Sequence, residues 1–211
     1  MANSPALSAQ NLCCLRGDNQ LFSDVSFNIA SGQCLHVTGP NGCGKTSLLR
    51  ILSGINTPES GEVLWQDKSA FDNSEFLAQS AYIAHKEGLK NELTAIENLR
   101  YYQQLDAKSD EAALDRLLAK MGILQCADLL AQNLSFGQRR RLSFARLLIA
   151  DFSLWILDEP FTGIDVDGRI LIESLCVEHL DNGGAIIMTH HQSLKDSPLN
   201  QYRSELALGK T

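Results

Sequence analysis

The sequence predicts an α/β fold in which buried parallel strands alternate with helices, with a helical segment inserted at about residues 88–150. Continuous apolar runs at 154–157 and 185–188 are typical of strands buried on both faces, and a helical pattern at 166–180 separates them. A glycine-rich loop at 39–46 follows one strand pattern and precedes a helix. Between these regions, helix caps and apolar residues at helical spacing indicate the inserted segment.

Short strands are expected before the glycine-rich loop, within residues 11–38. Apolar and polar residues alternate from 21 to 29, and Ala30-Ser31-Gly32 predicts a turn into the next strand. Turn-forming residues also interrupt the chain beyond the loop. In order, we expect strands at 21–29 and 34–38, a helix at 46–52, a turn at 57–61, and strands at 62–65 and 81–84.

The inserted segment shows two helix beginnings. Thr94 and Glu97 have the spacing of a capping box, and Ser109 is expected to cap a second, amphipathic helix that ends at Gly122. Because their spacing is helical, we interpret the apolar side chains of the second helix as core rather than as a cofactor site. These are Ala112, Leu114, Leu117, Leu118 and Met121.

Composition excludes several classes of protein. The chain has 211 residues, 44% of them hydrophobic, which suits one globular domain, and its net charge of −7 argues against nucleic acid as a partner. The one basic run, Arg139–Arg141, is interpreted as a solvated helix face near a phosphate site rather than a nucleic-acid patch. No apolar stretch approaches the roughly 20 residues of a membrane span, and no secretory signal is visible, so we expect a cytosolic chain.

The cysteines predict neither a disulfide framework nor a zinc site, because no two of them have the required spacing. We expect reduced and mostly buried thiols, with Cys43 set apart by its place inside the glycine-rich loop. The six are Cys13, Cys14, Cys34, Cys43, Cys126 and Cys176.

The glycine-rich loop fits the pattern G-x-x-x-x-G-K-[ST], and we call residues 39–46 the phosphate loop. Its glycines let backbone N–H groups close around phosphate oxygens, and the helix that follows points its positive end at the same anion. Lys45 supplies a charge for the β- and γ-phosphates, and the Thr46 hydroxyl is placed to bind Mg²⁺. The residues expected to bind nucleotide here are Gly39, Pro40, Asn41, Gly42, Cys43, Gly44, Lys45, Thr46 and Ser47.

Two acids end the apolar run at 154–157. Asp158 is expected to hold Mg²⁺, directly or through water, and Glu159 to polarise the attacking water. A helix cap or a solvated turn is the alternative for such a pair, and the upstream phosphate loop favours the catalytic interpretation.

A second anion site is expected at Leu134-Ser135-Phe136-Gly137-Gln138. Ser135 and Gln138 form a capping box, so a helix begins here with free N–H groups and no acid nearby. This segment resembles the LSGGQ signature of ABC ATPases, with Phe136 in place of the first glycine. The resemblance covers nearly the whole chain, in the family's order and spacing.

Membership of that family implies a single nucleotide-binding domain over 1–211, with a RecA-like core, an antiparallel β subdomain and a helical subdomain at about 88–150. It also implies a homodimer, in which Ser135, Gly137 and Gln138 of one subunit cover the ATP held by the phosphate loop of the other.

Further positions resemble functional residues of the same family. Asp165 ends a segment like the D-loop and would contact the opposite subunit, while His190 resembles the switch histidine that touches the γ-phosphate. A histidine after a strand is more often structural, and His191 is left unassigned. His85 replaces the usual glutamine and is expected at the metal. Arg16 replaces the aromatic that stacks on adenine, a role open to a guanidinium plane.

Within the superfamily, the chain most resembles the ATP-binding subunits of cytochrome c maturation (Ccm) haem exporters. The resemblance rests on VTGPNGCGKTSLLRILSG, HKEGLKNELTAIENLRYYQ, LSFGQRRRLSFARLL and ILDEPFTGIDVDG. It implies MgATP hydrolysis at the cytoplasmic face of a bacterial inner membrane, integral B and C subunits as partners, and haem handling through a periplasmic chaperone. We expect no haem bound to this chain. Another exporter's ATPase, a non-transport ABC ATPase and a binding module without hydrolysis are the alternatives.

Overall fold

The computed structural model describes residues 7–105, 111–191 and 193–209, which form two compact units. The first unit takes its residues from 1–82, 152–160 and 175–211, and the second from 83–151 and 161–174. The α/β class expected from the sequence is confirmed. In the described residues, no helix combines the length and hydropathy needed to cross a bilayer.

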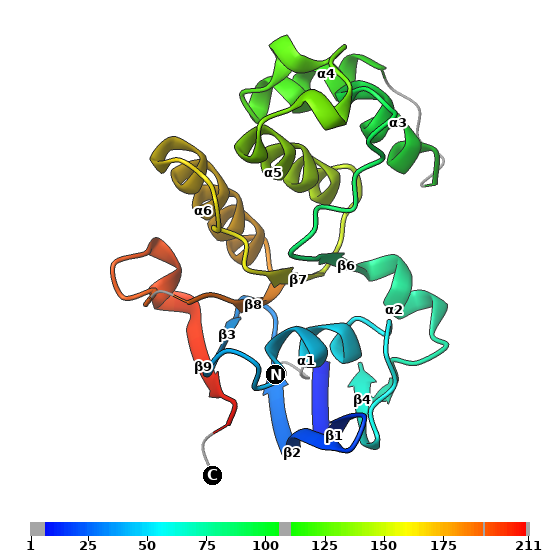
Figure 1. Ribbon diagram of the computed structural model, residues 1–211, viewed down its shortest axis with the longest axis vertical. Coiled ribbons are helices and arrows are strands. Elements are labelled where there is room, and N and C mark those ends of the chain that lie inside the picture. Colours follow the sequence, from blue (N-terminus) through cyan, green and yellow to red (C-terminus); the bar gives the residue numbers. More distant parts are fainter. Residues whose placement is uncertain (1–6, 106–110, 192, 210–211) are drawn as a thin grey trace. The chain divides into compact units, whose positions relative to one another are not determined.

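Two sheets build the core of the first unit (Figure 1). One is antiparallel, in the order β2-β1-β4-β5, and joins β1 (Leu7–Arg16), β2 (Asn19–Ile29), β4 (Ser60–Trp65) and β5 (Lys68–Ser69). The other has the order β6-β7-β8-β3-β9, with parallel pairing from β7 to β9. Its strands are β6 (Ser80–Ile83), β7 (Leu154–Asp158), β8 (Ala185–Thr189), β3 (Cys34–Thr38) and β9 (Arg203–Ala207).

Helix α1 (Lys45–Leu52) contacts strands of both sheets, β1 on one side and β7 and β8 on the other. Leu48, Leu49, Ile51 and Leu52 are at most 1% exposed and join one hydrophobic cluster with residues of both sheets. Burial of these side chains fixes the beginning of α1, and with it the phosphate loop, against the ends of the parallel strands.

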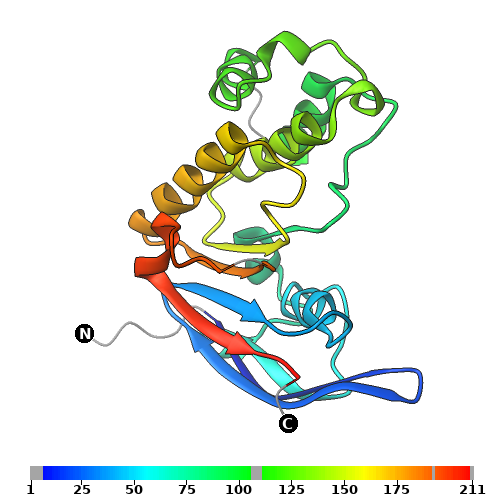
Figure 2. The same ribbon diagram turned by 60° about the vertical axis from the view of Figure 1, so that its left-hand side comes forward.

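The second unit is helical. Its elements are α3 (Ala95–Leu105), α4 (Glu111–Lys120), η1 (Leu124–Cys126), η2 (Ala131–Asn133), α5 (Phe136–Ala145) and η3 (Arg146–Leu148). Helix α6 (Val166–Asp181) begins in this unit and ends in the first, as one uninterrupted helix in Figure 2.

The helix beginnings expected in the second unit are confirmed where they are described. Glu97 Oε2 accepts from the Thr94 backbone N–H at 2.8 Å, and Thr94 Oγ1 accepts from Glu97 N–H at 3.2 Å. Of the five apolar side chains expected in the core here, Leu114, Leu118 and Met121 are buried, Leu117 is half-buried, and Ala112 is exposed, so the expectation was wrong for Ala112. Helix α4 ends at Lys120, and Gly122 follows with φ +66°. The expected cap Ser109 lies outside the described residues.

The elements that were not expected from the sequence include α2 (Ser74–Gln79), η4 (Pro198–Tyr202), β5 and β9. Asn73 caps α2 by accepting from two backbone N–H groups, and Phe76 of α2 packs against Trp65 with ring centroids 5.6 Å apart. The cysteines are free thiols; Cys34, Cys126 and Cys176 are buried and the other three are half-buried.

Candidate nucleotide-binding and hydrolysis site

The phosphate loop joins β3 to α1, and its glycines Gly39, Gly42 and Gly44 all have a positive φ. Gly39 has φ +145° and Gly44 has φ +98°, a region that L side chains rarely adopt. A Cβ at Gly39 would lie 2.6 Å from the Leu208 carbonyl oxygen, and one at Gly44 would lie 2.9 Å from the Phe22 ring. The loop is therefore enclosed by the β1–β2 hairpin and by the chain that follows β9.

Lys45 holds its ammonium group within this loop. Its Nζ donates to the carbonyl oxygens of Gly39 at 2.8 Å and Pro40 at 3.1 Å, and the residue is only 9% exposed. The first turn of α1 contains no acid, so the lysine and the N–H groups of the helix both favour an anion here.

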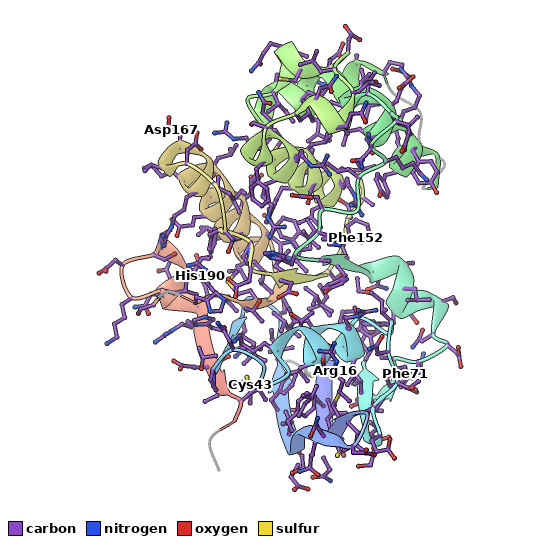
Figure 3. The ribbon with its side chains drawn as sticks, in the orientation of Figure 1. Arg16, Cys43, Phe71, Phe152, Asp167 and His190 are labelled. Carbon is purple, nitrogen blue, oxygen red and sulfur yellow. The ribbon has the colours of Figure 1, made fainter. Side chains whose placement is uncertain are left out.

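Two further residues predicted to bind nucleotide lie in the first unit, Ser47 on α1 and Arg16 at the end of β1. Ser47 interacts with the Cys14 thiol, and burial is the main reason that the pKa of Cys14 is raised. Arg16 ends β1 two residues later, exposed and opposite Asn19. Figure 3 labels it together with Cys43 of the phosphate loop. Stacking of Arg16 on adenine stays a prediction.

Asp158 is held by hydroxyl groups from two other elements. Thr46 Oγ1 donates to Asp158 Oδ2 at 2.9 Å, and Thr189 Oγ1 donates to Oδ1 at 2.7 Å. The second bond follows from the parallel register of β7 and β8, which places Asp158 beside Thr189. Burial and the nearby Asp158 charge raise the pKa of the Tyr82 phenol to about 12.

These residues suit a magnesium ion. Mg²⁺ prefers oxygen ligands, and the Thr46 hydroxyl and the Asp158 carboxylate present two of them within hydrogen-bonding distance of each other. An ion bound there would neutralise charge on the phosphates. His85 belongs to the second unit, is exposed, and offers nitrogen rather than oxygen, so its place at the metal stays a prediction with less chemical support.

Glu159 lies in a strained backbone conformation beside two histidines. Its φ is +52°, which is uncommon for a residue with a side chain, and its backbone N–H donates to Thr189 Oγ1 at 2.9 Å. His190 Nδ1 lies 3.7 Å from Glu159 Oε2, and His191 Nε2 lies 3.1 Å from Oε1. Glu159 and His190 (labelled in Figure 3) are 7% and 8% exposed, whereas His191 is exposed.

Sequence reasoning missed Thr189 and left His191 without a role. Thr189 is fully buried and links the two acids, because its hydroxyl accepts from Glu159 N–H while donating to Asp158. The available signal was a hydroxyl residue at the end of a strand parallel to the one that carries the acids.

The second predicted anion site begins helix α5 in the second unit. Ser135 Oγ accepts from Gln138 N–H at 3.2 Å, and Gln138 Oε1 accepts from Ser135 N–H at 2.9 Å, so the predicted capping box is confirmed. A Cβ at Gly137 would meet no atom within 4 Å, which leaves this end of the helix open. Its contact with nucleotide stays a prediction.

The interpretation of Arg139–Arg141 as a solvated face was wrong. Arg140 is 1% exposed and donates to the Ala84 carbonyl at 3.0 Å. Arg139 donates to Asn91 and to the Ala131 carbonyl, and Arg141 donates to Asp165 at 3.0 Å. Each guanidinium is turned toward the second unit's own backbone or side chains, because a helix carrying several arginines can be buried only if these are paired.

Phe136 and Asp165 have partners within the second unit. Gly163 accommodates Phe136, since a Cβ at Gly163 would lie 2.3 Å from the ring. Asp165 Oδ1 accepts from Gly168 N–H at 2.8 Å and from Arg141, and these two hydrogen bonds lower the pKa of the carboxyl. Asp165 therefore caps α6 in its own chain. Its contact with another subunit stays a prediction.

A phosphate loop beside a hydrogen-bonded acid pair, with a separate capped signature helix, defines an ABC-type ATPase. Residues 22–162 match the family model described as "ABC transporter", and the chain belongs to this family. It is 46% identical to the "Cytochrome c biogenesis ATP-binding export protein CcmA" of Idiomarina loihiensis, over 97% of this chain and 96% of that protein. The chain thus belongs, more narrowly, to the CcmA family.

Two further comparisons agree. The protein of the same name from Yersinia pestis is 43% identical, over 89% of this chain and 87% of its own length. A solved structure described as "ATP binding subunit of ABC transporter" superposes with a TM-score of 0.83, over 97% of this chain and 88% of that one. Its sequence identity of 23% means that this likeness shows the fold alone.

Proposed function

We propose that the chain is the ATP-hydrolysing subunit of a cytochrome c biogenesis export complex. Two copies would bind MgATP between them, each phosphate loop facing the Ser135 helix end of the other copy. The observation that carries the proposal is the hydrogen-bonded set of Thr46, Asp158, Thr189 and Glu159 beside the phosphate loop. The proposal is also supported by the names of relatives that are 43–46% identical.

In the proposed mechanism, each residue has a separate task. Lys45 and the loop N–H groups bind the β- and γ-phosphates, and Thr46 and Asp158 would hold Mg²⁺, which lowers the negative charge that an attacking oxygen meets. The Glu159 carboxylate accepts a hydrogen bond from water and orients it toward the γ-phosphate. His190 donates to a γ-phosphate oxygen, and the Ser135 helix end of the other copy adds N–H groups.

The same proposal places the homodimer at the cytoplasmic face of the inner membrane. Integral subunits of the Ccm system, of B and C type, would be its partners, and hydrolysis would drive haem export or release of the haem-loaded chaperone. No contact with nucleic acid is included. The relatives are named as export proteins, and a chain that only hydrolyses ATP needs membrane partners to perform export.

The first test uses three variants and measures nucleotide binding, hydrolysis and oligomeric state. Glu159→Gln is expected to bind ATP, stall hydrolysis and elute from gel filtration as a dimer with ATP, because the water-orienting carboxylate is lost while the binding groups remain. Lys45→Ala, the control, should not bind. Ser135→Arg should bind ATP without turnover, and full turnover by a monomeric variant would contradict the shared site.

The second test identifies the partners. The tagged chain is captured from detergent-solubilised membranes, and its companions are identified by mass spectrometry. The proposal expects integral subunits of the cytochrome c biogenesis system. A different membrane protein would assign the ATPase to another exporter, and a soluble companion would assign it to a non-transport complex.

A further inference from the structure

His36 is a buried histidine of the first unit that the proposed mechanism does not use. It lies on β3, the strand that leads into the phosphate loop, and it is 2% exposed. Its neighbours Leu35 and Val37 belong to the hydrophobic cluster around α1. Because side chains alternate along a strand, His36 faces the opposite side of the sheet.

The His36 ring contacts the backbone of the predicted switch histidine. His36 Nε2 lies 3.1 Å from the carbonyl oxygen of His190. Since a carbonyl only accepts, Nε2 must carry the proton and donate it. The paired register of β3 and β8 ends with Val37 opposite Thr189, so His190 is the first residue beyond the paired strands. Its carbonyl group is reached by the His36 side chain from β3.

The surroundings of His36 favour the neutral form of its ring. Burial is the main cause that lowers its pKa, and the positive charge of Arg203 and the His190 ring act in the same direction. Glu205 and the bond to the His190 carbonyl oppose the shift. His36 Nδ1 is buried and has no hydrogen-bonding partner among the described protein atoms. An apolar side chain would fill this place without burying a polar nitrogen, so packing alone does not account for a histidine here.

We propose that His36 is a positioning residue for ATP hydrolysis: its Nε2–H holds the backbone of His190 and so sets the His190 ring beside Glu159. The His190 ring already lies near the Glu159 carboxylate, since His190 Nδ1 is 3.7 Å from Glu159 Oε2. Strand β3, which carries His36, continues directly into the phosphate loop. One strand therefore positions both the loop and, through His36, the backbone of His190. The inference rests on the proposed catalytic roles of Glu159 and His190.

The test compares two substitutions of similar length in the purified full chain. His36→Met removes the donor, whereas His36→Gln keeps an amide N–H. We expect His36→Met to lower kcat about threefold to tenfold, with the KM for ATP changed by less than about twofold, because only the approach to the transition state is affected. His36→Gln should retain about half of the original kcat or more. An unchanged kcat in His36→Met, or equal losses of kcat and thermal midpoint in both variants, would overturn the inference.

A double-mutant cycle separates this inference from the proposed function. Single-turnover hydrolysis is measured for His190→Ala, His36→Met and the double variant. If His36 acts through His190, the double variant should match His190→Ala, whereas independent losses that multiply would indicate a structural role and overturn the inference. Full hydrolysis by His190→Ala would instead overturn the proposed role of His190. A loss in His190→Ala without one in His36→Met would overturn the inference alone.

Discussion

At the scale of single residues, the Thr189 hydroxyl links the two acids of the candidate hydrolysis site. It bonds to both Glu159 and Asp158, and it is fully buried. Thr189→Val keeps the shape of the side chain but leaves the Glu159 N–H and one Asp158 oxygen without this partner. We expect kcat to fall at least about tenfold, since an unpaired buried polar group costs about 1–3 kcal/mol.

The measurement is steady-state ATP hydrolysis, with Thr189→Ser as the matched control because it retains the hydroxyl. The serine variant should stay within about threefold of the original kcat. If the kcat of Thr189→Val were unchanged, ATP hydrolysis would not depend on the hydroxyl that bonds to both Asp158 and Glu159.

Residues with a local signature could be predicted from the sequence, whereas residues defined by long-range pairing could not. The phosphate loop and the Ser135–Gln138 capping box depend on neighbours a few positions away, so their geometry follows from the local sequence. Thr189 and His36 acquire their partners only through the register of β3, β7 and β8. No spacing within the chain indicates these contacts, and for Thr189 the sequence offers only a hydroxyl residue at the end of a strand.

At the scale of elements, arginines of α5 and η3 hold segment 84–91 of the second unit through hydrogen bonds and an ion pair. Arg140 donates to the Ala84 carbonyl, Arg139 contacts Glu87 and Asn91, and Arg146 donates to the Glu87 carbonyl at 2.9 Å. Arg146 also lies over the Tyr102 ring, 3.8 Å from its centroid. His85 lies in this segment. The segment is therefore held by hydrogen bonds to α5, the helix that Ser135 caps.

We predict that Arg140→Met loosens this segment. Methionine replaces the aliphatic stem but leaves the Ala84 carbonyl without its guanidinium donor, at a cost of about 1–3 kcal/mol. Backbone amides of 84–91 should then exchange with deuterium about tenfold faster or more, as read by mass spectrometry. Arg50→Met, at an exposed position on α1, is the control and should leave that exchange unchanged. Equal rates of deuterium exchange at 84–91 in the Arg140→Met and Arg50→Met variants would contradict the role of Arg140.

Strand β9 and helix α2 leave little pattern in the sequence, each for its own reason. Strand β9 reads Arg203-Ser204-Glu205-Leu206-Ala207, and it lacks the continuous apolar run that identifies β7 and β8 in the same sheet. An edge strand is solvated on one side, so its pairing with β3 leaves little trace in composition. Helix α2 has only six residues, too few to establish a helical period.

At the scale of the whole molecule, α6 is the helix shared by both units, and His179 fixes its last turns to the parallel sheet. The His179 ring stacks on Trp155 of β7 with centroids 3.9 Å apart and an interplanar angle of 8°. Its Nε2 lies 3.3 Å from the Ala185 carbonyl, at the start of β8. Burial lowers the pKa of His179 to about 4.

This shift predicts a dependence of the stability on pH. The pKa of His179 in the folded protein, about 4, lies below the roughly 6.5 expected when the chain is unfolded, so the unfolded chain takes up the proton first. The stabilisation is therefore complete above about pH 6.5 and decreases as the pH falls toward 4. Between pH 7.5 and 5.5, this one group should lower the free energy of unfolding by about 1 kcal/mol.

His179→Phe tests the prediction, because phenylalanine can still stack on Trp155 but cannot take up a proton. Urea unfolding is followed by circular dichroism at pH 7.5 and at pH 5.5 for both proteins. The variant should lose about 1 kcal/mol less stability than the original across this interval, whatever its stability at pH 7.5. His36 also has a lowered pKa, and it contributes acid sensitivity of the same sign to both proteins, so it cancels in the comparison. Equal losses in the two proteins would show that the ring at the end of α6 is not what makes the fold sensitive to acid.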